Sequence, residues 1–477
     1  MNEITTRKII SMRSFLPEVF MIMMVVMFAF GRMERNTEYM FFCGLFFLLA
    51  DILQKTKDLN GNIAYILYLL SFFIFLQGRY LVSIIMTGRM MTEFSEDISI
   101  HINQCIMISL AFIHIGYFLS NKILFTVKKK KKIKKSNICN NIVIDRCLLL
   151  FYLSSFFAIM SQIDIIIFVR NYSYVEYYLS YSSHIPRLLQ VFGNMYIAFF
   201  FIFLCTYPQK EKCKVPITVF LLISCLVLLT GDRGGMIQNI SALVVYCLWR
   251  QKQDKVIWIR PRTITIVFAL SPVIMAFLSF FVYLREGLDV GKLTLMAQLQ
   301  RFLSVSGRSA NVLGYAMIYK ERFSQKYYTF GGIIDYLKYN PISSSLFGFV
   351  KPRAQTAEYA LKMHSFDSAL SYFVYPRTYM NGHGIGSSYL AEIFFDFGYW
   401  GIAVFGIIYS ILLDKCKRLR EGYVCYNAVM LLIIRSLFYA PRGPALIFVT
   451  NIMNITTIGA FFIYFFVSRL KNEKIFH

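Results

Sequence analysis

Charged side chains are scarce in this chain of 477 residues, at 16% of the sequence. Soluble domains carry about a quarter of such residues. Hydrophobic residues make up 57% of the chain and the mean hydropathy is +0.55. The apolar residues gather in runs of about 17–25 residues, the length that crosses a bilayer. These observations exclude an ordinary soluble protein and predict a polytopic membrane protein.

Several common chemical motifs are also missing. The ten cysteines show no Cys-x-x-Cys spacing, and there is no P-loop, dinucleotide fingerprint or Ser-His-Asp set. We therefore expect no cofactor and no metal ligands. The net charge of +24 does not indicate nucleic acid, because basic residues of membrane proteins gather in cytoplasmic loops. No small-residue cleavage site follows the apolar run 15–30, so this run is expected to be a membrane helix.

The hydropathy pattern predicts an all-α fold of about 12 transmembrane helices. The expected spans are 15–31, 38–54, 63–86, 100–120, 145–168, 188–207, 215–231, 236–249, 263–284, 394–413, 423–440 and 444–468. Basic segments such as "VKKKKKIKK" and "DKCKRLR" then lie inside, which places both termini in the cytoplasm. The chain divides into nine spans (1–284), one large and partly helical extracytoplasmic loop (285–393), and three spans with a tail (394–477).

The predicted outer loops differ in composition from the inner ones. Arginine outnumbers lysine there, whereas lysine dominates the inner segments. A planar guanidinium grips phosphate or carboxylate through two parallel hydrogen bonds, which an ammonium cannot do. The loop 285–393 and the smaller loop 170–187 are rich in Tyr and Ser. Tyrosine is common at membrane interfaces, but this mixture also suits carbohydrate, whose ring faces stack on aromatics.

Three arginines end predicted spans on the outer side. Arg233 lies in "TGDRGG" beside Asp232, Arg285 in "VYLREG" and Arg442 in "APRGPA". Transporters carry a Gly-Asp-Arg-Gly turn on the cytoplasmic face, so the outward position of Arg233 disfavours that reading. Neighbouring glycines leave backbone N–H groups free to face an anion. We expect the three arginines to lie at one depth, where a cluster would bind a diphosphate.

Ionisable residues within or near spans supply the candidates for acid–base chemistry. Arg79 and Arg435 either bind a ligand or pair with a carboxylate for packing. A general base would come from the predicted outer residues, of which Glu392 and His383 are best placed, close to the re-entry into the membrane. The other candidates are His364, His184, Asp367 and Asp396.

The stretch "GHGIGSSYLAEIFFDFGYWGI" at Gly382–Ile402 resembles the Gly-x-Gly-Ser-Ser…Ala-Glu…Phe-Gly signature of O-antigen and capsule repeat-unit polymerases, the Wzy family. The likeness runs from about Asn171 to Phe466. It implies a metal-independent glycosyltransferase in the bacterial cytoplasmic (inner) membrane. The growing glycan would pass from undecaprenyl diphosphate to the non-reducing end of the next undecaprenyl-diphosphate-linked repeat unit. Membrane lipids and a chain-length regulator are the further partners that the resemblance implies.

The resemblance assigns roles to residues of this sequence. The diphosphate is expected to bind Arg233, Arg285 and Arg442, with Asp232 beside them. Glu392 or His383 takes the proton of the acceptor hydroxyl. The remaining expected substrate contacts are Arg308 and Arg377, for a sugar carboxylate or a second diphosphate, and Ser387 and Ser388 of the signature.

Two alternatives stay open at this stage. An O-antigen ligase shares the arginines and the large outer loop, although the Gly-Ser-Ser…Ala-Glu stretch favours the polymerase. A flippase or transporter of the same lipid-linked oligosaccharide suits twelve spans. The long outer loop and the lack of an internal repeat disfavour it.

Overall fold

The structure is a computed structural model that describes residues 3–127, 141–172, 174–286, 294–325 and 327–470. These residues form helices and contain no strand. The first helices are α1 (Glu3–Met33), α2 (Thr37–Lys55), α3 (Leu59–Phe72), α4 (Gly78–Thr87) and α5 (Glu96–Val127). The next are α6 (Asn141–Asn171), α7 (Tyr174–Ser180), α8 (Arg187–Asn194), α9 (Tyr196–Cys205), α10 (Lys210–Leu229), α11 (Arg233–Asp254), α12 (Pro261–Ala269) and α13 (Ser271–Glu286).

The second half of the chain begins with shorter helices. They are α14 (Leu295–Ser306), α15 (Ser309–Ile318), α16 (Gly331–Tyr339), α17 (Pro341–Phe347), α18 (Ala357–Lys362), α19 (Phe366–Val374) and α20 (Pro376–Met380). The last helices are α21 (Tyr389–Lys415), α22 (Val424–Leu437), α23 (Ile447–Met453) and α24 (Ile455–Arg469). A π-helical turn and five 3-10 turns link them: η2 (Phe73–Gln77), η1 (Thr56–Asp58), η4 (Lys320–Arg322), η5 (Tyr328–Phe330), η6 (Cys416–Arg418) and η7 (Ala440–Arg442).

Each of the twelve expected spans falls on one helix or on consecutive helices. Among the described residues, six helical stretches are long and apolar enough to cross a membrane, or seven if the pair α23 and α24, bent by 52°, is one span. The protein is therefore a multi-pass membrane protein. One stretch, Thr37–Thr87, contains two of the expected spans. The count of twelve stays a prediction.

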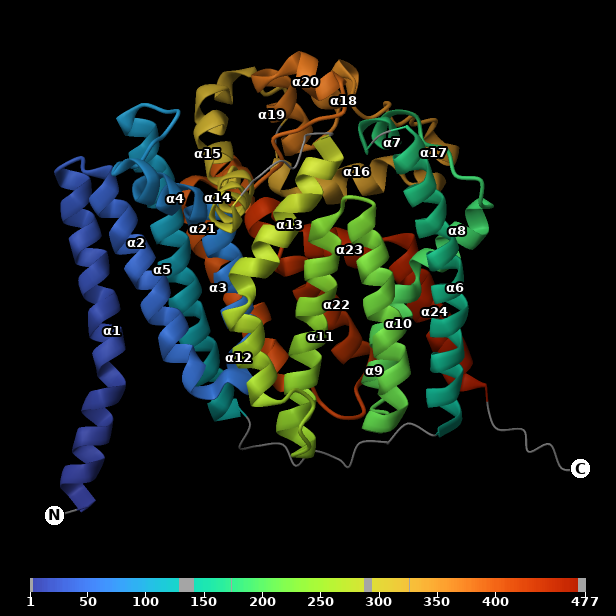
Figure 1. The fold of residues 1–477 in the computed structure, drawn as a ribbon, viewed down its shortest axis with the longest axis horizontal. Coiled ribbons are helices and arrows are strands. Elements are labelled where there is room, and N and C mark those ends of the chain that lie inside the picture. The colour runs from blue at the N-terminus through green and yellow to red at the C-terminus, as the bar shows by residue number, and fades with distance from the viewer. Residues whose placement is uncertain (1–2, 128–140, 173, 287–293, 326, 471–477) are drawn as a thin grey trace, which may run out of the picture.

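The expected outer loop is largely helical. Figure 1 shows α15, α18, α19 and α20 gathered at one end of the bundle, while α1 begins at the opposite end. We call the segment from α14 to α20 the cap. Helix α21 begins at Tyr389, earlier than the span expected from 394. The outward orientation of the cap stays a prediction from the charge pattern.

Glycines bring α5 and α21 close together in the core. A Cβ atom added at Gly116 would lie 2.8 Å from the Cα atom of Ile407, and one added at Gly406 would lie 3.1 Å from Phe112. Small residues of this kind let membrane helices approach closely. The hydroxyl of Tyr389 lies 2.5 Å from that of Ser109, so a polar contact also joins the two helices. This packing fixes the first turns of α21, next to which the candidate site lies.

Candidate active site

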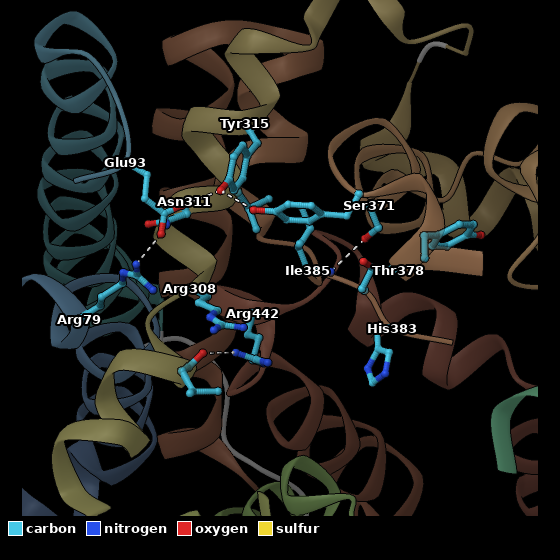
Figure 2. Close-up of a pocket in the computed structure, with 15 residues that line it drawn as sticks. Arg79, Glu93, Arg308, Asn311, Tyr315, Ser371, Thr378, His383, Ile385 and Arg442 are labelled. Atoms are coloured by element: carbon cyan, nitrogen blue, oxygen red, sulfur yellow. Dashed lines mark hydrogen bonds and ion pairs between the residues drawn. The ribbon is translucent and has the colours of Figure 1, made fainter. Parts of the chain in front are cut away.

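A cavity of about 510 Å³ lies between the cap and the ends of the membrane helices. Its volume is that of a small-molecule site, about 300–1,000 Å³. Its walls come from α4, α15, α19, α20, the loop before α21 and η7. Figure 2 shows the polar side chains that converge on it, among them Arg308, Arg442 and His383.

Arg442 enters the cavity from η7. Its Nη1 atom donates to the carbonyl oxygens of Val305 at 3.4 Å and Ser306 at 3.1 Å, at the end of α14. A helix C-terminus carries partial negative charge, so it favours a guanidinium there. The side chain is half-buried, and only its Nη1 atom donates a hydrogen bond to a described residue, which leaves further donors for a ligand.

Arg308 stands between α14 and α15, directly after Gly307, and its side chain is exposed. Gly307 has no room for a side chain, because an added Cβ would lie 2.6 Å from the Cβ atom of Arg79. The glycine thus lets the α14–α15 junction rest on α4. This contact brings Arg79 and Arg308 to the same cavity.

Arg79 follows the π-helical turn η2 on α4. Such turns occur often at functional sites. Its Nη2 atom lies 2.6 Å from Oε1 of Glu93, in the loop between α4 and α5. The other oxygen of Glu93 accepts from the hydroxyl of Tyr315 at 2.6 Å, and that hydroxyl lies 3.3 Å from the Tyr375 hydroxyl. Burial, followed by the hydrogen bond to Glu93, raises the pKa of Tyr315, so this phenol stays protonated.

The cavity lining contains three arginines and one glutamate, which gives an excess of two positive charges. Arg79 and Glu93 form an ion pair and offset each other. In the part of the chain that the structure describes, no carboxylate lies within ion-pair distance of Arg308 or Arg442. The cavity can therefore take an anion of charge −2.

His383 faces the cavity from the loop between α20 and α21. Its backbone N–H donates to the carbonyl of Thr378 at 3.1 Å, and its side chain is exposed. The loop turns sharply at Gly382 and Gly386, whose φ angles of +86° and +82° favour glycine. An imidazole in this position can exchange a proton with a bound hydroxyl.

Glu392 does not line the cavity. It is buried at 2% exposure on the first turn of α21. Its Oε1 atom accepts from the Ser387 hydroxyl at 2.6 Å, and its Oε2 atom accepts from the backbone N–H of Ala445 at 2.7 Å. Ser388, the N-cap residue of α21, is also buried. Glu392 thus ties the loop that carries His383 to the segment that follows Arg442.

The other expected substrate contacts lie elsewhere. Arg233 donates to the carbonyl of Leu278 at 3.3 Å and does not line the cavity. Asp232 caps α11 by accepting from the Gly235 N–H at 3.0 Å, which explains the aspartate in "TGDRGG". Arg377 is exposed on α20. Arg285 belongs to α13, and its side chain is outside the described part.

The remaining candidates make local contacts away from the cavity. His364 Nδ1 lies 3.0 Å from Asp335, and His184 Nδ1 lies 2.9 Å from Asp164. Arg435 donates to the side-chain oxygen of Asn239 at 2.6 Å. Its partner is thus an amide, whereas a carboxylate or a ligand was expected from the sequence. The two aspartates accept hydrogen bonds within the protein. The Ser365 hydroxyl donates to Asp367, and the Thr329 N–H donates to Asp396, which is remote in sequence.

Sequence reasoning missed seven polar lining residues. They are Glu93, Asn311, Tyr315, Ser371, Tyr375, Thr378 and Tyr379. Glu93 offered a weak signal, since acidic residues are few and this one lies in a short loop after Arg79. Its contact with Tyr315 spans 222 positions and depends on tertiary packing. Within the described ranges, no group of three or more His, Cys, Asp or Glu side chains could hold a metal ion.

The fold and this cavity define a multi-pass membrane protein with a polar, arginine-lined cavity under a helical cap. The sequence model of one protein family, described as O-antigen polysaccharide polymerase Wzy, matches residues 14–474. The match covers nearly the whole chain, so the chain belongs to this family. Searches of curated proteins and of solved structures found no match.

Proposed function

We propose that this protein polymerises lipid-linked oligosaccharide repeat units at the outer face of the cytoplasmic membrane. The growing glycan is transferred from undecaprenyl diphosphate to the non-reducing end of the next lipid-linked repeat. Membership in the polymerase family supports the reaction class. The observation that carries the assignment is the cavity in which Arg308, Arg442 and His383 converge.

Arg308 and Arg442, which have no carboxylate partner among the described residues, are suited to the donor diphosphate. A diphosphate esterified at both ends carries two negative charges, which Arg308 and Arg442 offset. Guanidinium groups bind phosphate through paired, charge-assisted hydrogen bonds. They also stabilise the negative charge that develops on the leaving diphosphate, and such stabilisation is usually the largest catalytic term.

His383 is proposed as the general base. The acceptor hydroxyl oxygen forms a bond to the anomeric carbon of the donor sugar while the bond from that carbon to the diphosphate oxygen breaks. The hydroxyl proton passes to the imidazole of His383, and undecaprenyl diphosphate leaves with the electron pair. Glu392 holds the loop of His383 from behind, through Ser387.

The finer assignments follow the same scheme. The hydropathy pattern favours twelve spans, and the charge pattern favours both termini in the cytoplasm, which puts the cap outside. Arg233, Arg285 and Arg377 remain candidates for contacts with the lipid diphosphates or with sugar carboxylates outside the cavity. Metal independence and a chain-length regulator are implied by the family likeness alone.

Surface polysaccharide from a strain lacking this gene tests the proposal. In an O-antigen strain, the ladder on a gel is expected to collapse to core plus one repeat unit, since export and ligation survive. Complementation with Arg442→Gln or His383→Ala should leave this collapsed pattern, whereas Arg322→Gln, an exposed cap residue outside the cavity, should restore the ladder. A deletion strain in which no repeat reaches the core would refute a polymerase and favour a ligase or a flippase.

A further inference from the structure

The wall of the cavity built around Glu93 has a different chemistry from the arginines. In the view of Figure 2, Arg308 and Arg442 lie between the Arg79–Glu93 pair and His383. Glu93 is the one carboxylate among the described lining residues. It is held in place from two sides, by Arg79 at 2.6 Å and by the Tyr315 hydroxyl at 2.6 Å. A carboxylate fixed in this way is a preorganised hydrogen-bond acceptor.

The charge of this wall is balanced. The guanidinium of Arg79 is offset by Glu93, so the wall does not add to the two positive charges that face the diphosphate. Glu93 keeps spare acceptor capacity, because a carboxylate has about four lone-pair sites and two contacts occupy only part of them. Its side chain is 48% exposed, so these sites are accessible from the cavity.

Further polar groups of the wall act as both donors and acceptors. Tyr315 and Tyr375 present their hydroxyls, and Asn311 presents an amide. The rings of Tyr315 and Tyr375 meet edge to face, with centroids 6.4 Å apart. Sugar hydroxyls need such a mixture, and sugar C–H faces pack on aromatic rings. Free phosphate or an anionic lipid headgroup would gain nothing from a carboxylate.

We propose that Glu93 and Tyr315 form a subsite that recognises the sugar attached to the donor diphosphate through its ring hydroxyls. This inference rests on the proposed function, because it takes the diphosphate to lie on Arg308 and Arg442. The first sugar is covalently bound to that diphosphate and must lie beside the arginines. The Glu93 wall lines the same cavity as these arginines and His383, so a sugar bound there stays in the cavity in which the acceptor hydroxyl must reach its anomeric carbon. The sugar class that fits is uncharged, because a uronate would meet the carboxylate of Glu93.

Binding measurements on the purified full chain in lipid nanodiscs test this subsite. The two probes are undecaprenyl diphosphate and the lipid-linked repeat unit extracted from a strain that lacks this gene. Glu93→Gln is expected to weaken binding of the lipid-linked repeat unit by about tenfold or more, as for hydrogen bonds to a charged group. The same substitution should not weaken binding of undecaprenyl diphosphate, because Arg308 and Arg442 remain.

Two further variants make the result specific. Glu96→Gln is the matched control, because Glu96 also pairs with an arginine, Arg35 at 3.2 Å, but lies outside the cavity. It should leave both affinities unchanged. Tyr315→Phe keeps the Arg79–Glu93 ion pair and removes one hydroxyl. It should weaken binding of the repeat unit by a smaller factor, and it tests the subsite even if Glu93→Gln does not fold.

The outcomes separate this inference from the function on which it rests. Arg442→Gln should weaken binding of both probes, and if it changes neither, the proposed diphosphate site is wrong. If Arg442→Gln weakens both probes while Glu93→Gln and Tyr315→Phe leave the affinity for the repeat unit at the parent value, the diphosphate site stands. The sugar subsite is then refuted.

Discussion

The buried carboxylate of Glu392 allows a sharp test of its role. If it were the general base, Glu392→Gln would remove the base and lower the polymerisation rate by a factor of about 10²–10⁴. The geometry leads to a different expectation. Both oxygens already accept hydrogen bonds, from Ser387 at 2.6 Å and from the Ala445 N–H at 2.7 Å. We therefore expect Glu392 to be a positioning residue.

The two bonds set the size of the effect. A typical hydrogen bond contributes about 0.5–1.5 kcal/mol, and a buried N–H left without an acceptor costs about 1–3 kcal/mol. Glu392→Ala removes both contacts, so we expect the free energy of unfolding to fall by about 2–4 kcal/mol. Glutamine can keep both, because its oxygen accepts from Ala445 and its amide donates to the rotatable Ser387 hydroxyl. Glu392→Gln should lose less than about 1 kcal/mol.

Two measurements on the same variants decide between the roles. The midpoint of thermal unfolding of the purified protein should fall clearly for Glu392→Ala and little for Glu392→Gln. The polysaccharide ladder in the complemented deletion strain should be largely restored by Glu392→Gln and impaired with Glu392→Ala. A Glu392→Gln protein of parental thermal stability that makes no polymer would refute the positioning role and identify Glu392 as a group that takes part in the chemistry.

Three further predictions concern residues outside the cavity. Asp232→Ala removes the N-cap of α11 and should lower the free energy of unfolding by about 0.5–2 kcal/mol. Asp232→Asn keeps a capping oxygen and should preserve both the stability and the polysaccharide ladder. Loss of the ladder in the Asp232→Asn variant would indicate that Asp232 binds substrate. Gly331→Ala should destabilise the cap by about 1–3 kcal/mol, because the added Cβ would lie 1.9 Å from the His364 carbonyl oxygen; an unchanged unfolding midpoint would contradict this packing. Burial raises the pKa of Asp335 above its ordinary 3.8, so its contribution to stability is largest below pH 3.8 and is lost as the pH rises through the raised value. The Asp335→Asn side chain cannot ionise, so this variant should lose less thermal stability than the parent as the pH rises through that range. If the unfolding midpoints of the two proteins change with pH in parallel, the pKa of Asp335 is not raised.

Much of the fold follows from hydropathy alone. Helix-length apolar runs must pair their backbone groups internally in lipid, so all twelve expected spans fall on helices. The breaks within them were harder to predict. The π-helical turn Phe73–Gln77 and the 52° bend between α23 and α24 depend on packing against neighbouring helices, which a hydropathy profile does not report. The short helices of the cap likewise depend on contacts with the bundle.

The candidate site was predictable where charge stood out against an apolar background. Arg308, Arg442 and His383 were expected as site residues and line one cavity. The expected grouping of Arg442 with Arg233 rested on equal depth at the ends of spans. Gly234 lies against Tyr439, close to Arg442 in the chain, but Arg233 does not line the cavity, because depth does not fix the direction of a side chain. The carboxylate of Glu93 was missed because its neighbour in space, Tyr315, is remote in sequence.

The contact at Gly307 has a consequence for related chains. The α14–α15 junction touches Arg79 where any side chain would collide, since a Cβ would also lie 2.8 Å from the Arg79 backbone nitrogen. The separation of Arg79 and Arg308 is thus set by how closely two helices can pack. A relative with a larger residue here would have to move α4 or the junction outward, and with them the positions of its charges. Variation at one side-chain-free position would then alter the dimensions of the binding site while every ligand-facing residue stayed the same.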